Sequence, residues 1–113
     1  MDKMIGYREL VKGHLLRVEA LAKQQPTPGI DTLCVFDDAR SSYLLLVTGW
    51  TKHHRVRGAT LFVRLKDEKI WVEEDWTEEG IVAELVKAGV PKEDIVLAFH
   101  SPEKRPYTEF AVA

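Results

Sequence analysis

Apolar residues return every three or four positions from Asp2 to about Gln24, at Met4, Tyr7, Val11, Leu15, Val18 and Ala22. This spacing predicts an amphipathic helix. Pro26 and Pro28 end it, because neither ring nitrogen can donate and each pushes the preceding residue out of the helical region. The apolar stripe could bind a partner helix, but packing on a sheet of the same chain is the favoured interpretation.

Four apolar segments that follow are typical of strands: Ile30 to Phe36, Tyr43 to Trp50, Arg55 to Leu65, and Ile70 to Glu74. The polar connections between them are short. None can hold a crossover helix, so the four segments are expected to pair as antiparallel hairpins.

The segment Tyr43 to Trp50 is apolar at both parities, with Tyr43 and Leu45 on one face and Leu44 and Leu46 on the other. A strand that is apolar on both faces is usually buried on both. Two helices cover little more than one face of such a sheet. A second copy of the chain is therefore predicted to cover the rest, as a possible homodimer.

The last third begins with a helix expected to start near Asp75 or Thr77 and to run to Ala88, because Asp75-x-x-Glu78 has capping-box spacing. Gly89 and Pro91 stop it. A short turn over Pro91–Asp94 and a buried strand, Ile95 to Phe99, follow. Tyr107 to Ala113 is expected to dock as an edge strand or tail.

The predicted fold is α+β, as one domain over residues 1–113. It has a long N-terminal helix, a four-stranded mainly antiparallel sheet, a second helix and further short C-terminal strand material. The hydrophobic fraction of 45% and charged fraction of 30% are those of a globular protein.

Charge and cysteine content narrow the function classes. Sixteen basic and eighteen acidic residues give a net charge of −2, so the chain is not a general polyanion binder. Cys34 has no partner for a disulfide and lies in an apolar run, which favours a reduced setting and a packing role. No signal-like segment follows Asp2, and no apolar run is long enough for a membrane span. A cytoplasmic protein is expected.

The chain lacks the usual signatures of catalysis. It has neither a glycine-rich phosphate loop nor a Gly-x-Ser-x-Gly elbow. His53 and His54 are adjacent, so on an extended segment they point to opposite sides and cannot share a metal unaided. No catalytic residue, metal or cofactor is predicted, and the chain is expected not to be an enzyme.

Candidate contact residues form two basic clusters and one aromatic position. The first cluster is Lys52, His53, His54, Arg55 and Arg57, and the second is Lys104 with Arg105 beside His100. Either could contact phosphate, although solvated loop charges are the favoured interpretation. Trp71 alternates away from Ile70 and Val72, so it is either a partner anchor or a core residue.

Several stretches resemble the XisI family, the fdxN element excision controlling factor proteins. They include Lys69-Ile70-Trp71-Val72, the run Ala83-Glu84-Leu85-Val86-x-x-Gly89-Val90-Pro91-Lys92-Glu93-Asp94-Ile95-Val96-Leu97, and Phe99-His100-x-Pro102 through Ala113. The resemblance runs nearly end to end. It departs at Glu68, where the family pattern has glycine after Asp67.

The resemblance implies an accessory factor that acts with an XisH-like protein and a site-specific recombinase in programmed excision of a DNA element. It supplies no catalytic residue to carry over. The first hypothesis is thus a non-enzymatic regulatory protein that binds an XisH-like partner. The second is an accessory protein that contacts DNA directly through the two basic clusters. Neither involves a membrane.

Overall fold

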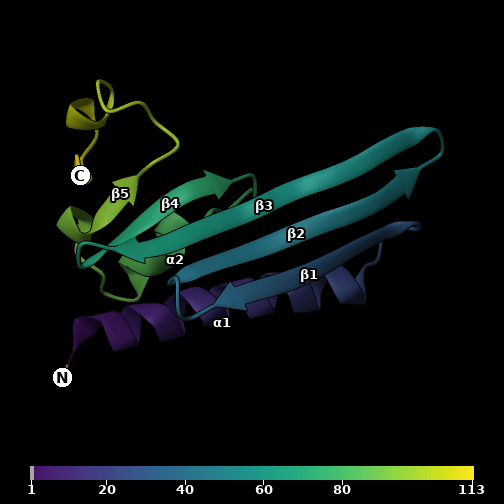
Figure 1. The fold of residues 1–113 in the computed structure, drawn as a ribbon, viewed down its shortest axis with the longest axis horizontal. Helices are drawn as coiled ribbons and strands as arrows, with labels where there is room; N and C mark the ends of the chain where they lie inside the picture. Colours follow the sequence, from purple (N-terminus) through teal and green to yellow (C-terminus); the bar gives the residue numbers. More distant parts are fainter. Residues whose placement is uncertain (1) are drawn as a thin grey trace.

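The structure is a computed structural model that describes residues 2–113. One five-stranded sheet has the strand order β1-β2-β3-β4-β5, and Figure 1 shows it with two helices. The elements are α1 (Lys3–Gln24), β1 (Ile30–Asp37), β2 (Ser42–Thr51), β3 (His54–Lys66), β4 (Lys69–Asp75), α2 (Ile81–Lys87), the 3₁₀ turn η1 (Lys92–Asp94), β5 (Ile95–Leu97) and the 3₁₀ turn η2 (Arg105–Tyr107). The α+β prediction is confirmed.

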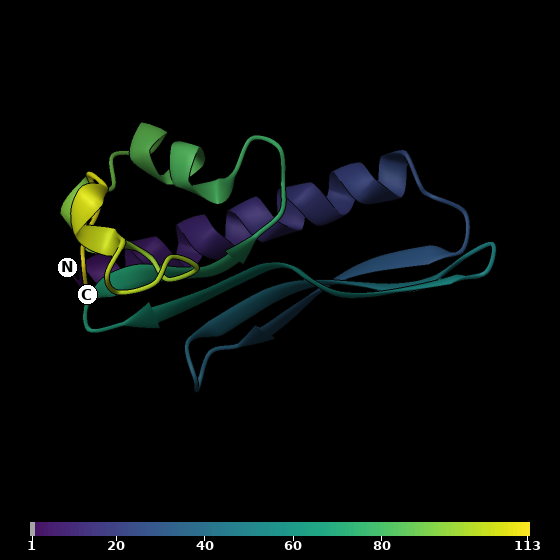
Figure 2. The same cartoon turned by 90° about the horizontal axis from the view of Figure 1, so that it is seen from above.

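Both helices pack on one face of the sheet, as Figure 2 shows. Asp2 begins α1, because its side chain accepts a hydrogen bond from the backbone N–H of Met4 at 2.9 Å. The core between α1, α2 and the sheet is formed by the alternating inward residues of the strands. Its fully buried members include Val11, Leu15, Tyr43, Leu45, Leu61, Val63, Ile70, Val72, Ile81 and Ile95.

The second helix starts later than its sequence predicts. It begins at Ile81, and β4 continues to Asp75 instead. The Asp75 carboxylate accepts hydrogen bonds from the backbone N–H groups of Thr77 at 3.0 Å and Ile81 at 2.7 Å. Asp75 therefore caps the helix from the end of the preceding strand, across a loop, and not from within a capping box.

The short strand β5 belongs to the same sheet as the other four. It pairs in parallel with β4, with Ile70 opposite Ile95 and Val72 opposite Leu97. Because α2 lies between these two strands in the chain, β4, α2 and β5 form a βαβ unit. The C-terminal tail forms no strand, and Ala111 alone bridges to Val96.

The strand β2 is buried on one face only. Tyr43 and Leu45 face the helices at 0% and 1% exposure, whereas Leu44 and Leu46 on the opposite face are half-buried and Trp50 is 56% exposed. The expectation of burial on both faces is thus not met within the chain. Among residues 2–113, no segment covers the second face of β2.

Two glycines set the close approach of β1 to β2. Trp50 donates its backbone N–H to the carbonyl oxygen of Gly29 at 3.0 Å. A Cβ atom at Gly49, where φ is 151°, would lie 1.9 Å from that same oxygen. Only a residue without a side chain fits there.

Candidate interaction surfaces

We define the outer half of the β2–β3 hairpin, residues 46–59, as the arm. Its tip lies beyond the end of α1 (Figure 2). The pairs run from Leu46 opposite Ala59 to Thr51 opposite His54. Its tip lies at the opposite end of the molecule from both termini (Figures 1 and 2). Because the molecule extends 43 Å along its longest axis, tip and termini cannot contact one ligand of modest size.

The first basic cluster gathers at this tip. Lys52, His53, His54, Arg55 and Arg57 are all exposed. Arg55 lies 5.8 Å from the ring of Trp50 and donates to the carbonyl oxygen of Gly49 and the hydroxyl of Thr48, both at 3.2 Å. The tip thus combines positive charge with one fixed, exposed indole.

Trp71 is part of the packed structure. Its side chain is 8% exposed, and its Nε1–H donates to the carbonyl oxygen of Lys66 at 3.0 Å. The Lys66 ammonium lies 4.6 Å and the Arg105 guanidinium 5.6 Å from its ring. Of the two interpretations left open by the sequence, burial within the chain describes Trp71.

The residues of the second basic cluster differ in their surroundings, because hydrogen bonds hold Arg105 against the backbone. Arg105 donates to the carbonyl oxygens of His100 at 3.1 Å, Ala98 at 3.4 Å and Val112 at 3.4 Å, which holds the C-terminal segment on the sheet. His100 is half-buried, with its ring 4.7 Å from that of Phe99. Lys104 alone is exposed. The two basic clusters lie at opposite ends and form no common patch.

An acidic aromatic groove lies where β4 ends, and sequence reasoning missed it. It is a cavity of about 650 Å³ lined by Glu73, Glu74, Asp75, Trp76, Ala98 and Phe99. Trp76 is 78% exposed, and its Nε1–H donates to the Glu74 carboxylate at 2.8 Å. The sequence signal for this groove was Trp76 directly after three acidic residues, but the spacing Asp75-x-x-Glu78 favoured a helix start for that stretch.

The sheet face away from the helices carries an apolar patch, which we call the open face. Leu33 lies opposite Leu46, Val35 opposite Leu44, and Leu44 opposite Phe62, so these side chains share one side of the sheet. Leu33 and Val35 are 39% and 40% exposed. Figure 2 shows no helix over this side. Contiguous apolar surface, when it is large, is a common feature of protein-binding faces.

His14 on α1 is buried without a hydrogen bond. Its Nε2 has no partner among the described residues, and the ring is 9% exposed. Burial lowers the pKa of His14, and the nearby Arg17 lowers it further against the opposite influence of Glu84. The residue lines a cavity of about 370 Å³ between α1 and the segment leading into α2.

Polar clusters elsewhere attach α1 to the rest of the fold. Asp94 accepts hydrogen bonds from the Tyr7 hydroxyl and from Lys3 at 3.2 Å. Burial and the Asp94 carboxylate raise the pKa of Tyr7 to about 12. Asp38 accepts from Lys12 and Tyr43 at 2.9 Å, and these bonds lower its pKa. The carboxylates of Asp38 and Asp94 therefore have a structural role, which is to attach α1 to the rest of the fold.

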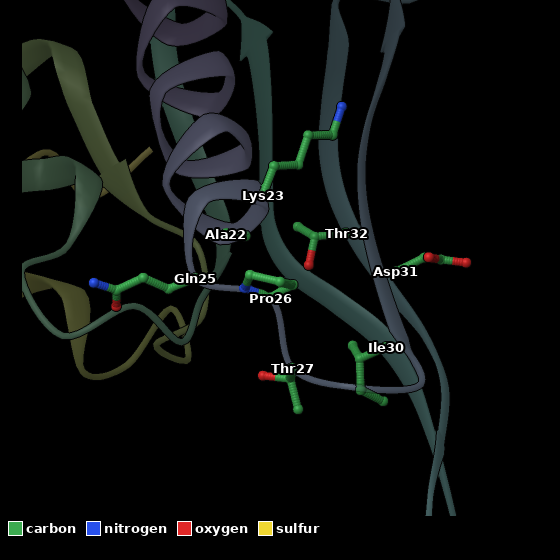
Figure 3. A pocket seen from close by; sticks show the side chains of 8 residues that line it. All are labelled: Ala22, Lys23, Gln25, Pro26, Thr27, Ile30, Asp31 and Thr32. Carbon is green, nitrogen blue, oxygen red and sulfur yellow. The ribbon is translucent and has the colours of Figure 1, made fainter.

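A further cavity, of about 230 Å³, lies between the end of α1 and the start of β1. In Figure 3 its polar side chains do not converge: Gln25 points away on one side and Asp31 on the other. Within residues 2–113, no group of three or more His, Cys, Asp or Glu side chains is placed to hold a metal ion. Cys34 is half-buried, and burial raises the pKa of its thiol to about 11.

No helix among the described residues is both long and apolar enough to cross a membrane. The fold and its surfaces define an α+β protein with one sheet face covered by helices, one open apolar face and a projecting basic arm. The family model for the XisI protein matches residues 1–112, and the chain belongs to the XisI family.

Two solved structures agree with this assignment. The chain is 33% identical to an XisI-like protein from Anabaena variabilis ATCC 29413, with a TM-score of 0.88 and coverage of 96% of this chain and 98% of that one. It is 36% identical to the fdxN element excision controlling factor XisI from the same organism, with a TM-score of 0.84 and coverage of 99% and 100%. No curated protein matches the chain.

Proposed function

We propose that this protein is a non-enzymatic regulatory factor that controls excision of a DNA element by binding an XisH-like partner. Its family and the name of its structural neighbour support a role in excision control. The observation that carries partner binding is the open face, where Leu33, Val35 and Leu44 remain accessible beside a well-packed core. An apolar sheet face of this kind favours a protein partner over a small substrate.

The test is co-purification with an XisH-like protein. We expect the pair to elute together in gel filtration, and Val35→Asp with Leu44→Asp to abolish the complex while circular dichroism stays unchanged. Leu21→Asp is the matched control, because Leu21 is 63% exposed on α1 and lies away from the open face. Separate peaks for the wild-type proteins would contradict the proposal.

A second candidate function is DNA binding, and the arm tip is the observation that favours it. Basic side chains and an exposed indole at the end of a two-stranded ribbon resemble the strand elements that enter DNA grooves. Lys104 and Arg105 lie at the other end of the molecule, so the contact would use the arm alone. We expect affinity to fall steeply with salt and Arg55→Glu with Arg57→Glu to remove it, whereas Lys104→Glu leaves it unchanged.

A further inference from the structure

The outer half of β3 has a neighbour on one side only. Pairing with β4 begins at Leu61, opposite Asp75, and runs to Lys66. Residues 54–59 pair with β2 on one side, and among residues 2–113 no strand pairs with them on the other. We call this segment the free edge. An uncovered strand edge is a ready template for another strand.

The two ends of the free edge carry opposite chemistry. At the arm tip, Lys52 and Arg55 supply positive charge. At the inner end, Trp76 donates its backbone N–H to the carbonyl oxygen of Thr60 at 2.9 Å, which closes the free edge there and places the acidic groove directly beside it. The groove can bind a cationic side chain, because it offers the carboxylate of Glu74 and the exposed rings of Trp76 and Phe99. Glu74 lies opposite Phe62.

We propose that a second copy of this chain binds the free edge, strand to strand, about a two-fold axis. Antiparallel pairing of two identical edges turns the outer end of one onto the inner end of the other. Beyond the paired residues, the arm of each copy turns out of the line of the partner's β4, because the partner's Asp75 already lies opposite its own Leu61. Its basic tip meets the partner's Glu74 and the partner's Trp76, and the contact occurs twice in a closed dimer.

The charges on the edge select one register. Directly opposite residues must share a sheet face. A two-fold axis normal to the sheet therefore passes midway between the two copies of one residue, which then lie opposite each other. At Val56 it would set Arg55 against Arg57 of the other copy, and at Arg57 it would set the two arginines face to face. Like charges directly opposite destabilise a pair. Centred on Gly58, each Arg57 lies opposite Ala59 of the other copy. The pairing ends there, because Thr60 already accepts a hydrogen bond from Trp76 and Leu61 already lies opposite Asp75.

Gly58 itself supports this register. Its φ is 149°, and a Cβ atom there would meet nothing within 4 Å. The positive φ by itself favours glycine there, and the empty space beside it leaves room for a second backbone. A glycine inside a strand often marks a place where another backbone approaches closely, and two facing Gly58 residues provide such an approach.

This inference deepens the homodimer expected from the sequence and moves it from the sheet face to the β3 edge. It does not rest on the XisH-like partner, because its test uses the purified chain alone. The strand pairing is short, so the dimer is expected to dissociate on dilution.

The test compares the mass in solution of four proteins by light scattering over a dilution series. We expect a dimer for the wild-type chain, and monomers for Glu74→Arg and for the double variant Lys52→Glu with Arg55→Glu. Mixing the two variants should restore a dimer, because each mixed pair has one native contact and one with both charges reversed. Lys104→Glu, at the other end of the molecule, should dimerise like the wild type.

Three results would overturn the proposal. One is a wild-type monomer at every concentration. A second is a wild-type dimer whose two variants both stay dimeric, since the copies would then meet elsewhere, for instance on the open face. Variants that are monomeric singly and stay so when mixed, although folded by circular dichroism, would also contradict the reciprocal contact.

Discussion

The β2–β3 hairpin has two halves that are built differently. In the inner half, Tyr43, Leu45, Leu61 and Val63 are at most 1% exposed beneath the helices. In the arm, residues 46–59, every side chain is half-buried or exposed. Burial of apolar surface holds the inner half. The arm is held by backbone pairing with β1 and across the hairpin, and by the hydrogen bonds of Arg55. The fold needs the first half, and the second is free to make contacts.

The largest expected effect separates the two halves within one strand. Leu61→Ala in the inner half should lower the free energy of unfolding by about 2–5 kcal/mol, because it leaves a cavity under α1. Val56→Ala in the arm should cost less than about 1 kcal/mol. Urea unfolding of both variants measures the difference. Equal losses would show that the arm is part of the core.

Backbone geometry at Gly49, within the arm, gives the next effect. Gly49→Ala would press a methyl group against the carbonyl oxygen of Gly29, so we expect a loss of about 1–3 kcal/mol. Gly13→Ala in α1 is the control, since it meets only the Arg17 guanidinium at 3.4 Å and should gain up to about 1 kcal/mol. Thermal unfolding compares them, and an unaffected Gly49→Ala would disprove the tight approach of β1.

The helix α1, which covers the inner half, carries a buried polar side chain, His14, and this residue predicts a pH dependence of stability. Burial lowers the pKa of His14 below the ordinary 6.5, so the unfolded chain binds the proton more readily than the folded one. Stability should therefore fall as the pH drops through the ordinary imidazole pKa. Besides Arg17 and Glu84, the charges that act on the ring are Asp75 and Glu79.

His14→Leu should flatten this pH dependence, and melting temperatures above and below that pKa measure it. His53→Gln, at the exposed arm tip, should leave the dependence as in the wild type. Asp38 and Asp94 have lowered pKa values, so their contribution is lost only at more acidic pH. A dependence unchanged in His14→Leu would refute the assignment to this ring.

The smallest effect concerns the turn at the inner end of β3. Asp67 and Glu68 have φ values of 53° and 60°, in the left-handed region that costs a residue with a side chain about 1–2 kcal/mol. Glu68→Gly should therefore raise stability by up to about 1 kcal/mol, after the greater freedom of glycine in the unfolded chain is subtracted. Glu103→Gly, in an exposed loop without a positive φ, should give no gain by the same unfolding measurement.

Much of the fold follows from the sequence because local patterns determine it. The three-and-four spacing from Met4 to Ala22 predicts α1, and the four strand segments agree with the structure to within one or two residues. The start of α2 was wrong because Asp75 caps the helix across a loop, a long-range hydrogen bond that local spacing does not encode. The family resemblance is confirmed by the match over residues 1–112.

The candidate surfaces were less predictable, because they depend on which segments meet in space. Sequence grouped the residues of the arm tip, since they are neighbours in the chain. It could not show that Arg105 covers Trp71, that Trp76 flanks Thr60, or that β4 ends halfway along β3. These follow from the lengths of paired strands, which the alternation of side chains does not set.

Hydrogen–deuterium exchange of the wild-type chain, at low and high protein concentration, tests the free edge most directly. The central claim is that the β3 edge of one copy pairs with that of another around Gly58. We predict that peptides covering residues 54–59 gain protection as concentration rises, while peptides covering β1 and the open face do not. Protection that rises on β1, or nowhere on the arm, would contradict the claim.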